Sequence, residues 1–168
     1  MKKSDKPISL NFHLSNTIGD VWTAISDHRS MLNWYFENIP DFRAEIGFKT
    51  SFVVQSDTRK FTHNWEVVEV EPESVIAYKW EYLEYEGDSI VRFTLHKTDA
   101  GTRINLNVVI LEDFSDDIPE FRRESCVGRR FLRWMPAACI GGRADENSPD
   151  RFRIVVDRRA FSLSLIHI

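Results

Sequence analysis

The chain has 168 residues, which is enough for one substantial core and too short for two. With 42% apolar and 29% charged residues and a formal net charge of −4, its composition is that of a globular protein and excludes a low-complexity chain. No apolar run approaches the length of a membrane span or of a signal peptide, so we expect a cytoplasmic protein without membrane insertion.

A strand and two short helices are predicted at the start of the chain. From Ile8 to Leu14 apolar and polar residues alternate, which is the period of a half-buried strand. Asn16 offers an N-cap for a helix that ends near Ser26. A second helical turn is predicted from Ser30, and it carries the apolar residues Met31, Leu32, Trp34, Tyr35 and Phe36.

From Phe48 the apolar period returns to two and predicts five further strands. Hairpin turns are expected at Ser56-Asp57-Thr58, Glu71-Pro72-Glu73, Glu86-Gly87-Asp88 and Asp99-Ala100-Gly101. At Val67-Val68 the apolar phase shifts by one residue, which predicts a β-bulge that bends the strand.

A closing helix is predicted after the last strand. Asp116 or Asp117 can cap it, Pro119 fits its first turn, and Pro136 stops it. The order of elements predicts an α+β fold: a curved antiparallel sheet of about six strands, with two short helices after the first strand, wrapped around a C-terminal α-helix.

The segment from Asp20 to Asp27, which reads DVWTAISD and leads to Leu32 and Trp34-Tyr35, resembles the START-like, or SRPBCC, superfamily. Within it, the chain is most similar to homologues of the activator of the heat-shock protein 90 ATPase. Further matching segments, in the expected order, are Phe42–Gly47, Trp65–Pro72, Tyr78–Trp80 and Gly101–Leu106. Together these segments cover roughly residues 8 to 128.

The resemblance implies a helix-grip fold, in which the sheet and the C-terminal helix enclose a cavity. Family members use such a cavity to bind lipids, sterols, polyketides or other apolar molecules. Some members catalyse cyclisation or dehydration, and others engage a chaperone.

The end of the chain departs from the family pattern, so we assign residues 1–135 to the START-like domain and residues 136–168 to a divergent tail. After Gly128 the expected second glycine and amphipathic stretch are missing, and residues 129–168 contain Arg but no Lys. The last six residues, Leu163 to Ile168, are similar to what a transposase adapter used in shotgun DNA sequencing encodes. We expect the tail to be disordered or a frameshift or sequencing artefact, the alternative being a genuine basic tail.

The inward parity of the strands predicts a ligand cavity lined mainly by aromatic side chains. Its predicted lining is Phe52, Phe61, His63, Trp65, Tyr78, Trp80, Tyr82, Phe93 and Leu106, with Phe121 from the closing helix. The same rings can simply fill a core. His63 can bond a ligand or act as a general base, although a lone histidine on an apolar face more often has a structural role.

The leading hypothesis is a cofactor-free binding domain for a small apolar molecule, lipid-like or aromatic, with no catalytic residue assigned. No pair of histidines or carboxylates has ligand spacing, so we expect no metal, and clustered glutamates argue against nucleic acid. One alternative is a stress-response co-regulator that contacts a heat-shock ATPase. The other is a polyketide-cyclase-like or dehydratase-like enzyme that uses His63 and a tyrosine hydroxyl. The sequence leaves the oligomeric state open.

Overall fold

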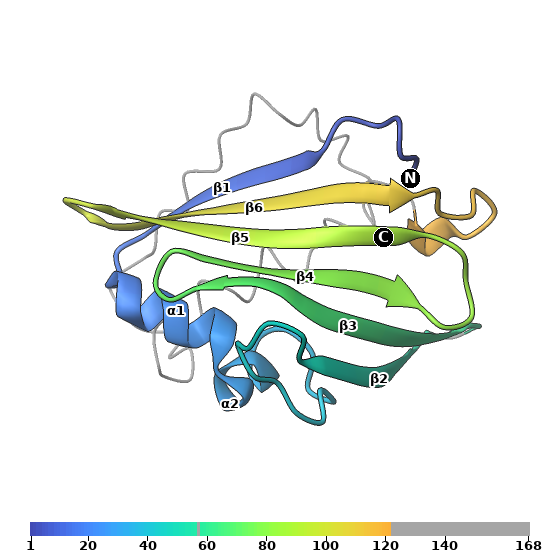
Figure 1. Cartoon of the computed structure of the whole chain (residues 1–168), viewed down its shortest axis with the longest axis horizontal. Helices are drawn as coiled ribbons and strands as arrows, with labels where there is room; N and C mark the ends of the chain where they lie inside the picture. Colours follow the sequence, from blue (N-terminus) through green and yellow to red (C-terminus); the bar gives the residue numbers. More distant parts are fainter. Residues whose placement is uncertain (57, 122–168) are drawn as a thin grey trace, which may run out of the picture.

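The computed structural model describes residues 1–56 and 58–121, and in them the chain forms one six-stranded antiparallel sheet. Its strands are β1 (Ile8–Leu14), β2 (Lys49–Gln55), β3 (Lys60–Glu71), β4 (Val75–Tyr82), β5 (Asp88–Thr98) and β6 (Gly101–Glu112). They lie in the order β1-β6-β5-β4-β3-β2 (Figure 1). The predicted strand number and the predicted turns between β3, β4, β5 and β6 are confirmed.

Two helices, α1 (Ile18–Ser26) and α2 (His28–Leu32), follow β1 and lie together at one end of the sheet (Figure 1). The described chain ends in a short 3-10 helix, η1 (Pro119–Phe121). The fold is therefore α+β, and the curved sheet with its helix pair fits the helix-grip arrangement. The remainder of the predicted C-terminal helix, and the predicted tail at 136–168, lie outside the described residues. No helix within residues 1–56 and 58–121 is long and apolar enough to cross a membrane.

The sheet has an apolar inner face and a polar outer face because the strand registers bring residues of like parity together. One inner row crosses four strands through directly paired residues, Leu10, Leu106, Phe93 and Ile76, all of them buried. The predicted bulge is confirmed, since the β3–β4 register shifts between Val67 and Glu69. The shift lets Val67 and Val70 both face inward, opposite Tyr78 and Ile76.

The helix starts differ from the sequence prediction. Thr17, not Asn16, caps α1, and its hydroxyl accepts a hydrogen bond from the Asp20 N–H at 3.2 Å. Asn16 is instead held to the sheet, because its carbonyl accepts from the Thr102 hydroxyl at 2.9 Å. The second helix, α2, begins at His28, two residues before the predicted start at Ser30, and its cap Asp27 accepts from the Ser30 N–H at 2.9 Å.

Two buried hydrogen bonds hold the helix pair and the segment after it against the sheet. The Trp34 indole N–H donates to the Ala24 carbonyl of α1 at 2.8 Å. The Tyr78 hydroxyl, on β4, donates to the Tyr35 hydroxyl at 2.8 Å, and burial raises the pKa of both tyrosines. Both hydroxyls are therefore neutral at physiological pH, and their bond joins the sheet to the segment after α2.

The opposite end of the sheet is closed by the N-terminus, which Figure 1 shows beside the turn that follows β6. The Phe114 N–H donates to the Met1 carbonyl at 2.9 Å, and the Met1 ammonium donates to the Phe121 carbonyl at 3.2 Å. An ion pair of 2.8 Å between Lys2 and Asp116 lies next to these bonds. The N-terminus thereby holds η1 against the sheet.

Gly101 starts β6 with φ of 132°, and a Cβ there would lie 2.1 Å from the Leu14 carbonyl oxygen. We expect Gly101→Ala to lower the free energy of unfolding by at least about 2 kcal/mol, because backbone strain and a clash with main chain add. Gly47→Ala is the matched control: its φ is 85°, but no atom lies within 4 Å of the added methyl group. Urea unfolding should show a clearly smaller loss for Gly47→Ala; equal losses would contradict the argument.

Removal of the Tyr35 hydroxyl leaves the buried Tyr78 hydroxyl without its acceptor. We expect Tyr35→Phe to cost about 1–2 kcal/mol, the usual penalty for an unmade buried hydrogen bond. The double variant Tyr35→Phe/Tyr78→Phe should recover part of this loss, because no hydroxyl is then stranded. Thermal or urea unfolding of the unchanged protein, the two single variants and the double variant measures the coupling between the two hydroxyls. If the stability losses of the single variants simply add up in the double variant, the two hydroxyls are not coupled.

Candidate functional site

Five rings pack around one point between the sheet and the segment that follows α2. We call Phe36, Phe52, His63, Trp65 and Trp80 the aromatic cluster. The ring of Phe36 lies 5.0 Å from His63, 5.2 Å from Phe52, 5.8 Å from Trp65 and 5.9 Å from Trp80, measured between centroids. The four partners of Phe36 are on β2, β3 and β4, so the strands fix their positions, whereas Phe36 belongs to irregular chain and is half-buried.

The strand registers explain why these rings meet. Phe52 pairs directly with His63, and Trp65 pairs with Trp80, so all four side chains point to the inner face. Phe52 and His63 stack at 4.9 Å with their planes 13° apart, and Trp65 and Trp80 meet edge-on at 5.1 Å. Such pairs stabilise the sheet beyond their burial.

The aromatic cluster contains polar atoms that are buried without a hydrogen-bond partner among the described residues. They are the His63 Nδ1, the Trp65 Nε1 and the Trp80 Nε1, and the Thr50 hydroxyl opposite Trp65 is a fourth. His63 is 5% exposed and Trp65 2%. Buried polar groups are nearly always bonded, so several in one place indicate a site that a further molecule can satisfy.

Burial lowers the pKa of His63 to about 4, and the charge of Glu84 only partly opposes this. The imidazole is therefore neutral at physiological pH. A neutral His63 is suited to hydrogen bonding within an apolar site. The enzymatic alternative, with His63 and a tyrosine hydroxyl, stays a prediction. Of the tyrosines, Tyr78 donates its hydroxyl to Tyr35.

The ten predicted lining residues do not form one cluster. Phe52, His63, Trp65 and Trp80 are in the aromatic cluster, and Tyr78 adjoins it by stacking on Trp65 at 4.8 Å. Phe93 and Leu106 belong to the same large core, further along the sheet. A second cluster at the N-terminal end holds Phe61, Tyr82 and Phe121, together with Tyr85, Ile110, Phe114 and Ile118.

Tyr82 lies between the two groups of rings: its ring is 4.8 Å from His63 and 5.0 Å from Phe121. The predicted cavity lining is therefore contiguous through Tyr82. Whether these residues line a cavity remains a prediction.

The sequence pattern did not reveal the contribution of the segment after α2. Phe36 and Tyr35 contact the cluster from the side opposite the sheet, since Tyr35 lies 5.3 Å from Trp65. Phe42 adds an edge contact of 6.4 Å with the same indole. The three consecutive aromatic residues Trp34 to Phe36 could have indicated this contribution. Their segment is irregular, however, so no periodic pattern predicts the direction of their side chains.

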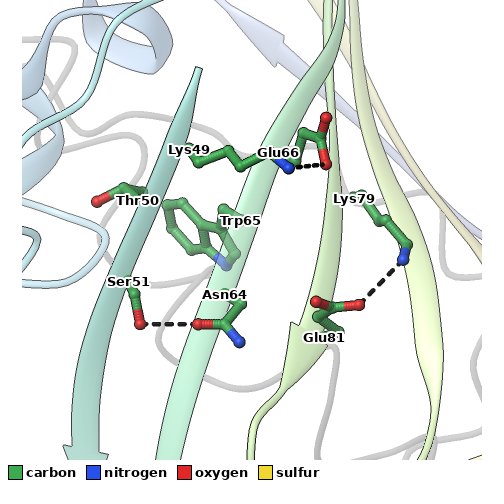
Figure 2. Close-up of a pocket in the computed structure, with 8 residues that line it drawn as sticks. All are labelled: Lys49, Thr50, Ser51, Asn64, Trp65, Glu66, Lys79 and Glu81. Atoms are coloured by element: carbon green, nitrogen blue, oxygen red, sulfur yellow. Dashed lines mark hydrogen bonds and ion pairs between the residues drawn. The ribbon is translucent and has the colours of Figure 1, made fainter. Parts of the chain in front are cut away.

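A depression of about 340 Å³ lies on the sheet and is lined by Lys49, Thr50, Ser51, Asn64, Trp65, Glu66, Lys79 and Glu81. Figure 2 shows its charged side chains paired with one another, Lys49 with Glu66 and Lys79 with Glu81. By parity Thr50 and Trp65 belong to the inner face, whereas the other six lining residues, all polar, are on the outer face. This polar depression is not the apolar cavity that the sequence predicts.

The comparisons with known proteins agree with this fold. The family model described as "Activator of Hsp90 ATPase homolog 1-like protein" matches residues 16–125. No protein among the curated proteins matches the chain.

Three solved structures illustrate the likeness of fold. Protein MLL2253 from Mesorhizobium loti is 20% identical with a TM-score of 0.61, covering 82% of this chain and 99% of its own. Protein Mll3558 from Rhizobium loti is 13% identical with a TM-score of 0.68, covering 79% of this chain and 96% of its own. DynU16, from the dynemicin biosynthetic locus, is 17% identical with a TM-score of 0.62, covering 79% of this chain and 46% of its own.

These identities establish a shared fold and no more. The family model, in contrast, spans more than half of the chain and includes the helix pair, β2 to β6 and the turn after them. The chain therefore belongs to the family of Activator of Hsp90 ATPase homolog 1-like proteins.

Proposed function

We propose that this domain binds a small, largely apolar molecule at the aromatic cluster, against the inner faces of β2, β3 and β4. The observation that carries the proposal is the set of unpartnered nitrogens of His63, Trp65 and Trp80 within a cluster of rings. Binding sites for small molecules are apolar surfaces with a few convergent polar groups, and this cluster has that composition.

Phe36 gives such a ligand a route to the cluster. It is half-buried and belongs to the irregular chain between α2 and β2, whereas its ring partners are held by strand pairing. The ring of Phe36 occupies the space between Phe52, Trp65 and Trp80. An aromatic ligand takes this place when Phe36 swings outward, because only the loop has to move.

The family match favours a second candidate function, contact with a chaperone ATPase. Such contact would use the surface of the domain rather than its aromatic cluster. It predicts that the protein changes the ATPase turnover of heat-shock protein 90 and that substitutions at the aromatic cluster leave this change intact if the fold is kept.

Phe36→Ala should open the binding site, and N-phenyl-1-naphthylamine is a suitable neutral probe because its fluorescence rises on burial. We expect the variant to bind the probe about 10-fold more tightly than the unchanged protein, since the probe no longer displaces a ring worth about 1.5 kcal/mol of burial. Phe48→Ala is the control, because Phe48 is also half-buried but lies outside the aromatic cluster. Equal dissociation constants for all three proteins, or no binding, would refute the proposal.

The depressed pKa of His63 predicts a pH dependence of stability. The folded-state pKa is about 4 and the unfolded-state value about 6.5, so the unfolded chain binds more protons between these pH values. Stability should therefore fall as the pH is lowered from about 6.5 to 4, by about 3 kcal/mol from this group. His63→Phe keeps a ring for Phe52 to stack on and should remove this part of the pH dependence.

Urea unfolding at intervals between pH 7.5 and 4 measures the effect as the difference between the two proteins. His13→Gln is the control, because it also removes one imidazole, but from an exposed position on β1 outside the aromatic cluster. Parallel profiles for the unchanged protein and His63→Phe would show that His63 is not buried in a neutral state.

A further inference from the structure

We infer that the ligand of the aromatic cluster is an uncharged aromatic molecule that presents a hydrogen-bond acceptor, such as a ketone or ester carbonyl, to the indole N–H groups of Trp65 and Trp80. This inference rests on the proposed function and specifies the chemical class of its ligand. Three observations support it: the donors that are left over, the absence of cations among the described residues that face them, and the contrast with indoles that are satisfied.

The unpartnered indoles determine which hydrogen-bonding groups the ligand has to carry. An indole N–H can only donate, so a molecule that satisfies Trp65 and Trp80 has to supply acceptor atoms. The two ring centroids are 5.1 Å apart, so one small ligand can contact both indoles. The Thr50 hydroxyl and the His63 imidazole can each donate or accept, so they tolerate either kind of group and do not select.

The charges around the site disfavour an anion. By strand register no Lys or Arg of β2, β3 or β4 faces inward, and Lys49 and Lys79 are on the outer face, paired with Glu66 and Glu81. His63 is neutral because burial lowers its pKa to about 4. A carboxylate at the cluster would lose its hydration without gaining a counter-charge from these strands, and a neutral carbonyl avoids that cost.

The contrast with Trp34 shows that an indole in this core need not be left unbonded. Its N–H donates to the Ala24 carbonyl at 2.8 Å, and the Tyr78 hydroxyl is likewise bonded, to Tyr35. Tyr78 stacks on Trp65 of the aromatic cluster at 4.8 Å, and Trp34 stacks at 4.7 Å on Tyr35, which itself lies 5.3 Å from Trp65. Of the indoles of Trp34, Trp65 and Trp80, only the two that contact Phe36, Trp65 and Trp80, have an N–H without a partner among the described residues.

Three probes with one fluorophore test the inference on the full chain at pH 7.5. They are 6-propionyl-2-(dimethylamino)naphthalene, a neutral ketone; 6-(dimethylamino)naphthalene-2-carboxylate, an anion; and 2-(dimethylamino)naphthalene, which has no acceptor oxygen. We expect the ketone to bind at least about 10-fold more tightly than the carboxylate, because the anion alone loses hydration without a counter-charge. The emission of the bound ketone should also lie at longer wavelength than its emission in an apolar solvent without hydrogen-bond donors, because a hydrogen bond to the carbonyl shifts the emission to the red.

Two variants remove the donors and keep an aromatic ring. Trp80→Phe and Trp65→Phe should each weaken binding of the ketone by about 3- to 10-fold, the worth of one hydrogen bond, and leave 2-(dimethylamino)naphthalene unaffected. Trp22→Phe is the control, because Trp22 is a half-buried indole on α1. Trp80 is itself only half-buried, so Trp80→Phe decides the matter if Trp65→Phe does not fold.

The possible results separate the inference from the proposed function. If the carboxylate binds as tightly as the ketone, or if the Trp variants weaken all three probes equally, the inference is overturned while the binding function stands. If none of the three probes binds, the proposed function fails and the inference fails with it.

Discussion

The site depends on the pairing register of three neighbouring strands. Because Phe52 lies opposite His63 and Trp65 lies between Thr50 and Trp80, the side chains of these residues face inward together. A slip of one residue in β3 would turn His63 and Trp65 to the outer face and bring Asn64 and Glu66 into the core. The bulge after Val67 restores the inward direction for the rest of β3, so the strand bends without losing its apolar face.

The same core contains polar rings with hydrogen-bond partners and polar rings without them, and the two kinds lie in different places. The Trp34 indole and the Tyr78 hydroxyl attach α1 and the segment after α2 to the sheet by hydrogen bonds. The indole N–H groups of Trp65 and Trp80 make no hydrogen bond to the described residues, and both rings contact Phe36. Leaving buried donors unbonded lowers stability, so retaining them is consistent with a site kept for another molecule.

The two faces of the sheet also differ in charge. On the outer face, Lys49, Lys79 and Arg92 each pair with a carboxylate, and the outer depression is polar and internally compensated. The inner face of the strands is apolar, and its one titratable imidazole is held neutral. Membership of the family accounts for the fold, whereas the charge and hydrogen-bonding character of the inner face come from this chain's own residues.

The sequence by itself determined the order of elements, the inward parity of the strands and the bulge at Val67-Val68, because these follow from local period and turn chemistry. It misplaced the cap of α1 at Asn16, since only tertiary contact with Thr102 shows that Asn16 is already engaged. It did not show that the predicted lining falls into two clusters, with Phe61 and Phe121 in a different one from Trp65 and Tyr82 between them. Only the tertiary structure brought Phe36 to His63 and the two indoles: irregular chain has no period, and its side chains are directed by what they pack against.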